Sequence, residues 1–256
     1  MKLELNKIYN EDCAKGLKKL EETSVDLIIA DPPFNISFQK LSRENLYNRK
    51  KDRIIDGYVE ITSDYEEFCL GWISESYRVL KDSGSFFVIS GFNKLGVIIN
   101  CLEKSGFTIL NHIIWQYQFP PNTKKKFVTS HYTILFCCKN PKKHKFNPYC
   151  RFDFDATTAE GKKAHYQDRS SVWPISRENW AGYKTTKTRL PKALVKKIIE
   201  YGSERGDLVV DCFVGSGQGP YISREIGRDY IGFEISRLHF EFAKERLRKN
   251  QYKIPA

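Results

Sequence analysis

A carboxylate, two prolines and an aromatic ring stand directly after a short apolar run, residues 25–30. They are Asp31, Pro32, Pro33 and Phe34. In parallel sheets, reactive residues lie beyond the carboxyl ends of the strands. Proline fixes φ and removes a backbone donor, but its carbonyl remains an acceptor. The tetrapeptide therefore offers a carboxylate, a carbonyl oxygen and a stacking surface at one strand end.

This set of groups suits an exocyclic amino group of a nucleobase. The lone pair of such a group is delocalised into the ring, so the nitrogen is a poor nucleophile. Hydrogen bonds from its two N–H groups to Asp31 and to the Pro32 carbonyl would draw electron density to the nitrogen and aim the lone pair at a methyl donor. Phe34 would stack on the base after the base leaves the duplex. The competing interpretation is a Pro-Pro turn with Asp31 as a cap.

A second motif, near the end of the sequence, joins a strand to a glycine turn. The apolar run 208–210 ends in Asp211, and Gly215 and Gly217 follow closely. Glycine allows positive φ and close approach of a ligand to the backbone. Another apolar run delivers Glu234 roughly 20 residues on, the spacing at which an acidic side chain meets the ribose hydroxyls of an adenosyl ligand. NAD and a purely structural turn are the alternatives at this point.

The order of the motifs counts against NAD. A dinucleotide-binding fingerprint opens its sheet, whereas only one strand and one helix are predicted after this turn. The full G-x-G-x-x-G is also missing, because Gly219 and then Pro220 follow Gly217. S-adenosylmethionine has no pyrophosphate and does not require that fingerprint. We therefore expect S-adenosylmethionine as the cofactor and a permuted order, with the cofactor half last.

The remaining pattern predicts an α/β fold with a mostly parallel sheet and an antiparallel edge. Two stretches interrupt it: residues 38–62, expected to be a mobile loop, and residues 139–187, expected to be a target-recognition insertion. We expect one domain, 1–256. The predicted strands are 25–30, 85–90, 107–115, 131–138, 208–211 and 230–234. The predicted helices are 68–80, with a turn at 81–84, then 95–104, 190–201, 220–226 and 237–250.

The charge of the chain favours a polyanionic partner. The net charge is +11 at pH 7, and each phosphate that a cation neutralises releases a counterion. On charge alone, a solvated basic surface that binds no nucleic acid is an equal alternative. Together with the tetrapeptide, the charge leads us to expect double-stranded DNA, with binding that weakens in salt. The candidate DNA-binding residues are Arg43, Lys50, Lys51, Lys124, Lys125, Lys126 and Arg177. Lys142 and Lys143 are further candidates for phosphate, and Trp173, Arg177, Asn179 and Trp180 for base edges.

Several classes of protein and site are not expected. The seven cysteines are an odd number for a disulfide framework, and neither cysteines nor histidines have metal-ligand spacing. No apolar run approaches the ~20 residues that span a bilayer, and no secretory signal is apparent. We therefore expect a cytoplasmic protein with free thiols, no metal and no membrane partner. A homodimer is left open.

In this order, Asp31-Pro32-Pro33-Phe34 and the segment from Asp211 to Gly217 resemble the β-class DNA amino-methyltransferases. The resemblance covers nearly the whole chain and implies a Rossmann-like, S-adenosylmethionine-dependent methyltransferase fold. It also implies a type II restriction–modification enzyme that flips a base out of DNA and methylates adenine N6. Asn10-Glu11-Asp12-Cys13 matches the N-terminal motif that reaches the cofactor adenine. The implied cofactor-binding residues are Asp12, Cys13, Asp31, Thr188, Asp211, Phe213, Gly215, Ser216, Gly217 and Glu234.

Some positions depart from the family pattern. Residues 186–191 keep only Thr188 and Pro191 of the usual run, which leaves the contacts of the cofactor carboxylate open. Gln218 and Gly219 stand where two threonines are usual, and Phe34 replaces a tyrosine. Methylation of cytosine N4 is the nearest alternative, although that reaction more often has Ser at position 31. A catalytically silent nucleic-acid-binding module and an RNA or protein amide methyltransferase are the others.

Overall fold

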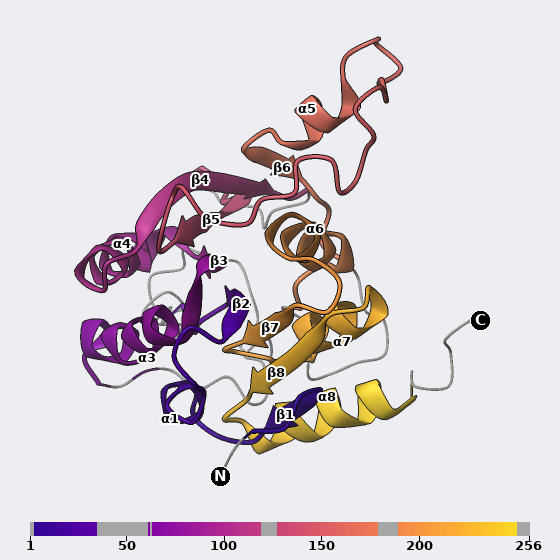
Figure 1. Ribbon diagram of the computed structural model, residues 1–256. Coiled ribbons are helices and arrows are strands. Elements are labelled where there is room, and N and C mark those ends of the chain that lie inside the picture. Colours follow the sequence, from indigo (N-terminus) through magenta and orange to yellow (C-terminus); the bar gives the residue numbers. More distant parts are fainter. Residues whose placement is uncertain (1–2, 35–60, 62, 119–126, 179–188, 250–256) are drawn as a thin grey trace.

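The computed structural model describes residues 3–34, 61, 63–118, 127–178 and 189–249. Within these residues the chain forms an eight-stranded sheet in the order β1-β8-β7-β2-β3-β5-β4-β6 (Figure 1). The strands are β1 (Lys7–Tyr9), β2 (Val25–Ala30), β3 (Leu80–Ser90), β4 (Thr108–Gln116), β5 (His131–Cys138), β6 (Val172–Pro174), β7 (Leu208–Asp211) and β8 (Asp229–Phe233). The helices are α1 (Cys13–Leu17), α3 (Tyr65–Val79), the 3-10 helix η2 (Phe92–Lys94), α4 (Leu95–Lys104), α5 (Ala164–Asp168), α6 (Lys192–Gly202), α7 (Gln218–Glu225) and α8 (Arg237–Lys249).

The sheet is mostly parallel, as expected. β5 is the exception, because it runs antiparallel to both of its neighbours, β3 and β4. The amino end of β5 therefore lies at the same edge of the sheet as the carboxyl ends of β2, β3, β4 and β7. Residues that follow those strands and residues that open β5 meet at this edge, which we call the carboxyl edge.

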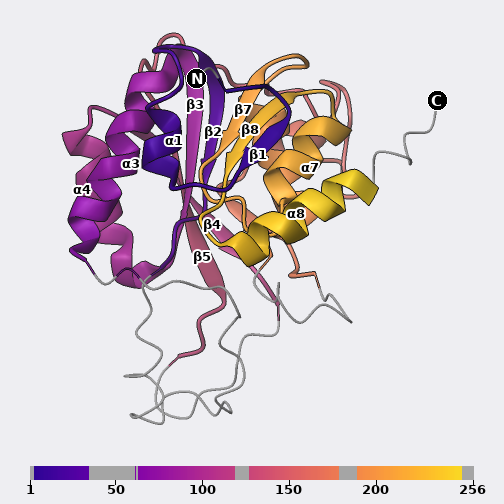
Figure 2. The ribbon, with the colours of Figure 1, turned by 90° about the horizontal axis from the view of Figure 1, so that it is seen from below.

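Side chains of the buried strands alternate between two cores, one on each face of the sheet. Ile28 and Ala30 face the core covered by α1, α3 and α4, which contains Trp72. Leu27 and Ile29 face the core covered by α6 and α7. Figure 2 shows α3 and α4 on one side of the sheet and α7 and α8 on the other. Burial on both faces explains why β2 is a continuous apolar run apart from Asp26.

The predicted turn at 81–84 is wrong, because α3 ends at Val79 and β3 begins at Leu80. Two contacts hold this polar stretch in the sheet. Lys81 Nζ lies 2.8 Å from both carboxylate oxygens of Asp26 on β2. The Leu80 side chain occupies the space beside Gly84, where a Cβ would lie 2.6 Å from it. Glycine there makes room for the leucine and does not end the strand.

The predicted permuted order is confirmed by how the ends of the sheet pair. β1 lies parallel to β8, with Lys7 opposite Ile231, and β8 lies parallel to β7. The N-terminal and C-terminal segments thus share the half of the sheet that carries the glycine turn. The sequence did not predict β1, α1, α5 and β6, which span three to five residues each. All seven cysteines are free thiols. Among the described helices, none is long and apolar enough to cross a membrane.

Candidate active site

Two carboxylates, the buried Asp211 and the half-buried Asp31, stand at neighbouring strand ends on the carboxyl edge. Asp211 closes β7, and Asp31 directly follows β2, its neighbour in the sheet. Burial raises the pKa of Asp31 to about 7, and the negative charge of Asp211 adds to this rise. Burial also raises the pKa of Asp211 to about 7, with the charge of Glu234 contributing. A carboxylate whose pKa is raised by burial and by a neighbouring negative charge favours a cationic ligand beside it.

The tetrapeptide after β2 is held by contacts on both sides. The Tyr65 hydroxyl, at the start of α3, donates a hydrogen bond to the Pro33 carbonyl at 2.8 Å. The Phe34 ring lies 5.3 Å from the Tyr132 ring, centroid to centroid. A Cβ on Gly91 would lie 3.3 Å from Phe34. Among the described residues no hydrogen bond reaches the Pro32 carbonyl, so this oxygen and the Asp31 carboxylate are the acceptors that the tetrapeptide offers.

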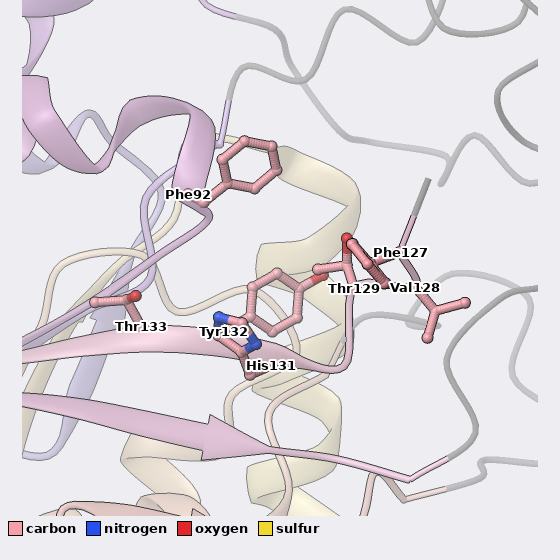
Figure 3. Close-up of a pocket in the computed structure, with 7 residues that line it drawn as sticks. All are labelled: Phe92, Phe127, Val128, Thr129, His131, Tyr132 and Thr133. Atoms are coloured by element: carbon pink, nitrogen blue, oxygen red, sulfur yellow. The ribbon is translucent and has the colours of Figure 1, made fainter. Parts of the chain in front are cut away.

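A cavity of about 450 Å³ opens beside this ring pair. Phe92, after β3, and the segment from Phe127 to Thr133, which leads into β5, line it (Figure 3). Tyr132 belongs both to this lining and to the ring pair with Phe34. The Phe92 side chain is 70% exposed, an unusual position for a phenylalanine in a folded protein. The cavity thus presents aromatic surface next to the catalytic candidates.

Carboxylates hold the glycine turn from behind. Gly215 has φ +51° and Gly217 has φ +82°, a region that favours glycine. One carboxylate oxygen of Glu234 accepts the Gly215 N–H at 2.7 Å, and the other accepts the Ser236 N–H at 2.8 Å. Asp211 accepts the Phe213 N–H at 3.1 Å. Each carboxylate oxygen has a second lone pair, so these residues can fix the turn and still accept from a ligand.

Gly215 and Gly217 have different surroundings. A Cβ on Gly215 would meet nothing closer than the Phe213 carbonyl at 3.9 Å, which leaves open space on that side of the turn. A Cβ on Gly217 would instead lie 3.0 Å from Ala243 of α8. The physical reason for Gly217 is therefore its positive φ together with the approach of α8. Gly215 is the glycine beside open space.

The N-terminal motif lies beside Glu234, the residue whose carboxylate accepts from the glycine turn. The Asn10 side-chain amide donates to the Glu234 carbonyl at 2.8 Å. Asp12 caps α1 by accepting the Lys15 N–H at 3.1 Å. The Cys13 side chain is buried in the core beneath, so only its backbone can face a ligand. Asp12 and Glu234 thus lie near the same half of the site.

Two candidate DNA contacts are placed elsewhere by the structure. Trp173 is buried in β6, where its indole N–H donates to the Ser170 carbonyl at 2.8 Å, so it cannot read base edges. Lys143 follows β5 and forms an ion pair with Asp82. Because β5 is antiparallel, that pair lies at the edge of the sheet opposite Asp31. The other candidates Thr188, Arg43, Lys50, Lys51, Lys124, Lys125, Lys126, Asn179 and Trp180, and nearly all of 38–62, lie outside the described residues.

Sequence reasoning missed several residues of the site. Tyr132 shares a strand face with Ile134 and Phe136, and this period of two could have indicated it. Arg189 is buried, and its Nε donates to the Ser216 hydroxyl at 2.8 Å. Arg246 of α8 donates to the Ser216 carbonyl at 3.0 Å. No sequence signal pointed to these two arginines, because their partners are distant in the chain.

A buried ionic cluster anchors the segment that carries α5 and β6. Asp168, at the end of α5, accepts from Arg151 Nε at 2.9 Å, from Lys197 Nζ at 3.1 Å and from the Tyr201 hydroxyl at 2.7 Å. Lys197 and Tyr201 belong to α6, and Lys197 also lies over the Trp173 ring at 4.7 Å. Residues 139–175 are thereby fixed to α6, although α5 and its flanking loops extend beyond β6 in Figure 1.

The part of the chain that the structure describes contains no group of three or more histidine, cysteine or acidic residues that could hold a metal ion. The groups that the structure describes at the carboxyl edge are carboxylates, carbonyl oxygens, aromatic faces and the backbone of the glycine turn. These groups can bind and orient an amino group beside a cationic ligand.

Comparisons with known proteins identify a family. A model described as DNA methylase matches residues 25–245. The chain is 33% identical to the type II methyltransferase M.HinfI of Haemophilus influenzae, over 96% of this chain and 69% of that protein. It is 30% identical to the type II methyltransferase M2.DpnII of Streptococcus pneumoniae, over 94% of this chain and 88% of that protein.

Solved structures share the fold. The M1.HpyAVI–SAM complex matches with a TM-score of 0.66 and 22% identity, over 94% of this chain and 98% of that one. PvuII DNA methyltransferase, which is cytosine-N4-specific, matches with a TM-score of 0.71 and 19% identity, over 99% of this chain and 89% of that one.

Proposed function

The chain belongs to the DNA methylase family of N6 and N4 methyltransferases, and from this premise we propose that it methylates adenine N6 in double-stranded DNA with S-adenosylmethionine as the donor. The observation that carries the proposal is the position of Asp31. Its carboxylate stands between the glycine turn and the aromatic cavity, in a tetrapeptide that offers the Pro32 carbonyl as the second acceptor.

The residues present fit the cofactor. Gly215 leaves open space before the turn, and the carboxylates of Asp31, Asp211 and Glu234 suit a ligand that carries positive charge. The implied cofactor-binding residues that the structure describes lie in or beside the turn. When bound, S-adenosylmethionine would supply an electrophilic methyl group on its sulfonium.

The tetrapeptide would then act on a flipped adenine. Phe34 stacks on the base, while Tyr132 and Phe92 line the space beside it. Asp31 and the Pro32 carbonyl accept the two amino N–H groups and so direct the nitrogen lone pair towards the glycine turn. A carboxylate with a pKa near 7 also suits the removal of the proton that the nitrogen loses on methylation.

The residue type at position 31, and not the fold, favours adenine over cytosine as the target base. PvuII DNA methyltransferase shares the fold and is cytosine-N4-specific, so the architecture does not discriminate between the bases. Asp31 favours adenine, because the family resemblance associates cytosine N4 enzymes with serine at this position. The negative carboxylate is also the stronger acceptor of a hydrogen bond.

Several finer features belong to this proposal. The chain acts as a single domain, with residues 139–187 as the target-recognition segment and residues 38–62 as a second segment that contacts DNA. Arg43, Lys50, Lys51, Lys124, Lys125 and Lys126 contact phosphates. The relatives named above are type II methyltransferases, so the enzyme serves a restriction–modification system in the cytoplasm. A homodimer is compatible with these roles.

Nucleoside analysis tests the function. The protein is incubated with duplex DNA and methyl-labelled S-adenosylmethionine, and the DNA is digested and analysed by mass spectrometry. Label in N6-methyladenine, absent with Asp31→Ala, is the expected result. Label in N4-methylcytosine would replace adenine by cytosine as the target. No label in DNA, from a protein that binds the cofactor, would overturn the proposal.

A further inference from the structure

Arg177 is an exposed arginine that lies over an aromatic ring and whose hydrogen-bond donors meet no partner in the part of the chain that the structure describes. Its guanidinium carbon lies 3.7 Å from the centroid of the Tyr117 ring and 5.4 Å from that of Tyr132. Among the described residues, none forms a hydrogen bond or an ion pair with Arg177. A stacked guanidinium keeps its in-plane N–H groups free for a partner that approaches edge-on.

The ring beneath Arg177 is firmly held. The Tyr117 side chain is buried, its backbone N–H donates to the Ser130 carbonyl and its hydroxyl to the Thr129 carbonyl, both at 2.9 Å. The strand that leads to Arg177 is held as well, because the Ile175 N–H donates to the Gln116 carbonyl at 3.0 Å. The indole N–H of Trp115 donates to the Ile175 carbonyl at 2.8 Å. The stack is therefore a built feature of the β4–β6 edge.

Other arginines of the described chain serve the fold. Arg78, Arg151 and Arg228 each bond to backbone carbonyls or carboxylates of distant elements. Arg205 is exposed like Arg177, but no aromatic ring lies beneath it within the described residues. It follows α6 and precedes β7, at the edge of the sheet opposite Asp31. Arg177 combines a fixed plane with free donors on the same edge as the candidate active site.

The surroundings of Arg177 suit a base edge. A hollow of about 150 Å³ beside it is lined by Gln116, Tyr117, Gln118, Pro174 and Ser176, which include amide and hydroxyl groups able to donate and accept. Tyr132, the second ring under Arg177, is also the ring that packs on Phe34 at 5.3 Å. Arg177 thus stands one ring away from the catalytic tetrapeptide, a separation of a few base steps of about 3.4 Å each.

We propose that Arg177 reads a guanine close to the methylated base, by donating two hydrogen bonds from its fork to O6 and N7. Tyr117 holds the plane of the fork. Arginine paired with guanine in this way is the commonest specific contact in the major groove. A phosphate could also take the fork in bidentate fashion, but the amide and hydroxyl groups that line the hollow beside Arg177 favour a base edge. The inference rests on the proposed function.

The test compares sequence preference between variants. The wild-type protein, Arg177→Lys, Tyr117→Leu and the control Arg205→Lys methylate duplexes with randomised positions around the target adenine, and sequencing reads which duplexes carry label. Arg177→Lys keeps the charge but loses the fork. We expect it to relax the preference for guanine at one position by roughly 10- to 100-fold, and Arg205→Lys to leave every preference unchanged.

A modified base identifies the contact. The guanine at the affected position is replaced by 7-deazaguanine, which lacks the N7 acceptor. The wild-type protein should lose roughly tenfold in kcat/KM on this duplex, whereas Arg177→Lys, which lacks a planar fork that spans O6 and N7, should lose clearly less. Tyr117→Leu should weaken guanine preference while cofactor affinity, measured by calorimetry, and thermal unfolding show whether its fold is kept.

Three outcomes decide between the explanations. If Arg177→Lys retains every preference, or lowers methylation equally on all sequences, Arg177 contacts phosphate or nothing and the inference is overturned. If 7-deazaguanine affects wild type and Arg177→Lys alike, Arg177 does not read N7 and the inference is again overturned. If the wild-type protein labels no duplex although it binds cofactor, the proposed function itself fails, which is a separate result.

Discussion

The two halves of the carboxyl edge are built in different ways. The half around the glycine turn consists of backbone: positive φ at Gly215 and Gly217, and carboxylates whose oxygens accept backbone N–H groups. The half around β4, β5 and β6 consists of side chains that face outward, among them Phe92 and Arg177. A small ligand of fixed shape can be held by backbone, whereas a stretch of DNA must be read by side chains that differ from one protein to another. Asp31 stands where the two halves meet.

Removal of the Asp31 side chain should lower the rate of methyl transfer far more than it lowers the affinity for cofactor or DNA. We expect Asp31→Ala to lose methyl transfer by roughly 100- to 1000-fold, because a hydrogen-bonding group matched to the transition state contributes about that much. Affinity for the cofactor should fall far less than turnover, because Glu234 and the glycine turn carry most of it, and affinity for DNA should change little. Asp31→Asn should be milder, since its carbonyl oxygen still accepts one N–H. Single-turnover methylation and fluorescence binding to DNA measure these effects.

Asp82→Ala is the matched control, because that carboxylate is exposed and lies at the opposite edge of the sheet. It should leave turnover unchanged. If Asp31→Ala turns over at the wild-type rate, another residue has the role between the two halves that we assign to Asp31.

The pH dependence of kcat/KM should also report on Asp31, which stands between the two halves. The folded-state pKa of Asp31 is raised to about 7, so the carboxylate is protonated below that pH and loses the charge that polarises the amino group. We expect kcat/KM to rise about tenfold per pH unit below pH 7 and to level off above it. Asp31→Asn should flatten this limb of the profile. Identical profiles for the two proteins would assign the titration to another group, such as Asp211.

A substitution in the turn should act on the cofactor half alone. Gly217 has φ +82°, and a side chain there would press on Ala243 of α8. We expect Gly217→Val to distort the turn and weaken cofactor binding by tenfold or more, since the left-handed conformation alone costs about 1–2 kcal/mol and β-branching adds to that. Calorimetric titration of the cofactor measures the loss, and DNA binding should be kept.

Gly206→Val is the control that separates the effect of backbone strain from an effect on the cofactor site. Gly206 also has positive φ, +83°, but a Cβ there would meet nothing within 4 Å. This variant should lower stability without affecting cofactor affinity. Equal cofactor affinity in both variants would mean that the glycine turn does not form the cofactor site.

The smallest effect should come from the cluster that anchors the other half. Lys197→Met leaves Asp168 with fewer partners in a largely buried place, so we expect the free energy of unfolding to fall by about 1–3 kcal/mol. Site preference on DNA should broaden, and cofactor affinity should stay within twofold. Denaturant unfolding and methylation of mixed duplexes measure these effects. Lys196→Met, an exposed neighbour on α6, should do neither. Unchanged preference in Lys197→Met would argue that residues 139–175 take no part in target choice.

The same division explains what could be predicted from sequence. The cofactor half could be predicted because its glycines, Asp211 and Glu234 are close in the chain. The family and fold that these residues indicated are confirmed by the comparisons and by the sheet. The strand 131–138 and the helix 95–104 were predicted with the observed bounds. Periodicity alone sufficed there.

The target half could not be predicted in the same way. Trp173 was expected at a surface that reads DNA, but it pairs into the sheet through β6. Tyr132 joins Phe34, and Arg177 joins Tyr117, only because β5 and β6 both reach the carboxyl edge next to β4. Lys197 approaches Asp168 from α6. Each of these contacts depends on which elements become neighbours in three dimensions, and no local pattern of residues carries that information.

The pairing of β1 with β8 also sets the order in which the protein can become active during synthesis. The tetrapeptide at 31–34 is made long before Glu234. The Asn10 side-chain amide donates to the backbone carbonyl of Glu234, which lies 224 positions later in the chain. At 5–20 residues per second, roughly ten to forty seconds pass between the two. A nascent chain on the ribosome therefore carries its catalytic residues without a place for the methyl donor, and it cannot modify DNA until β8 has emerged.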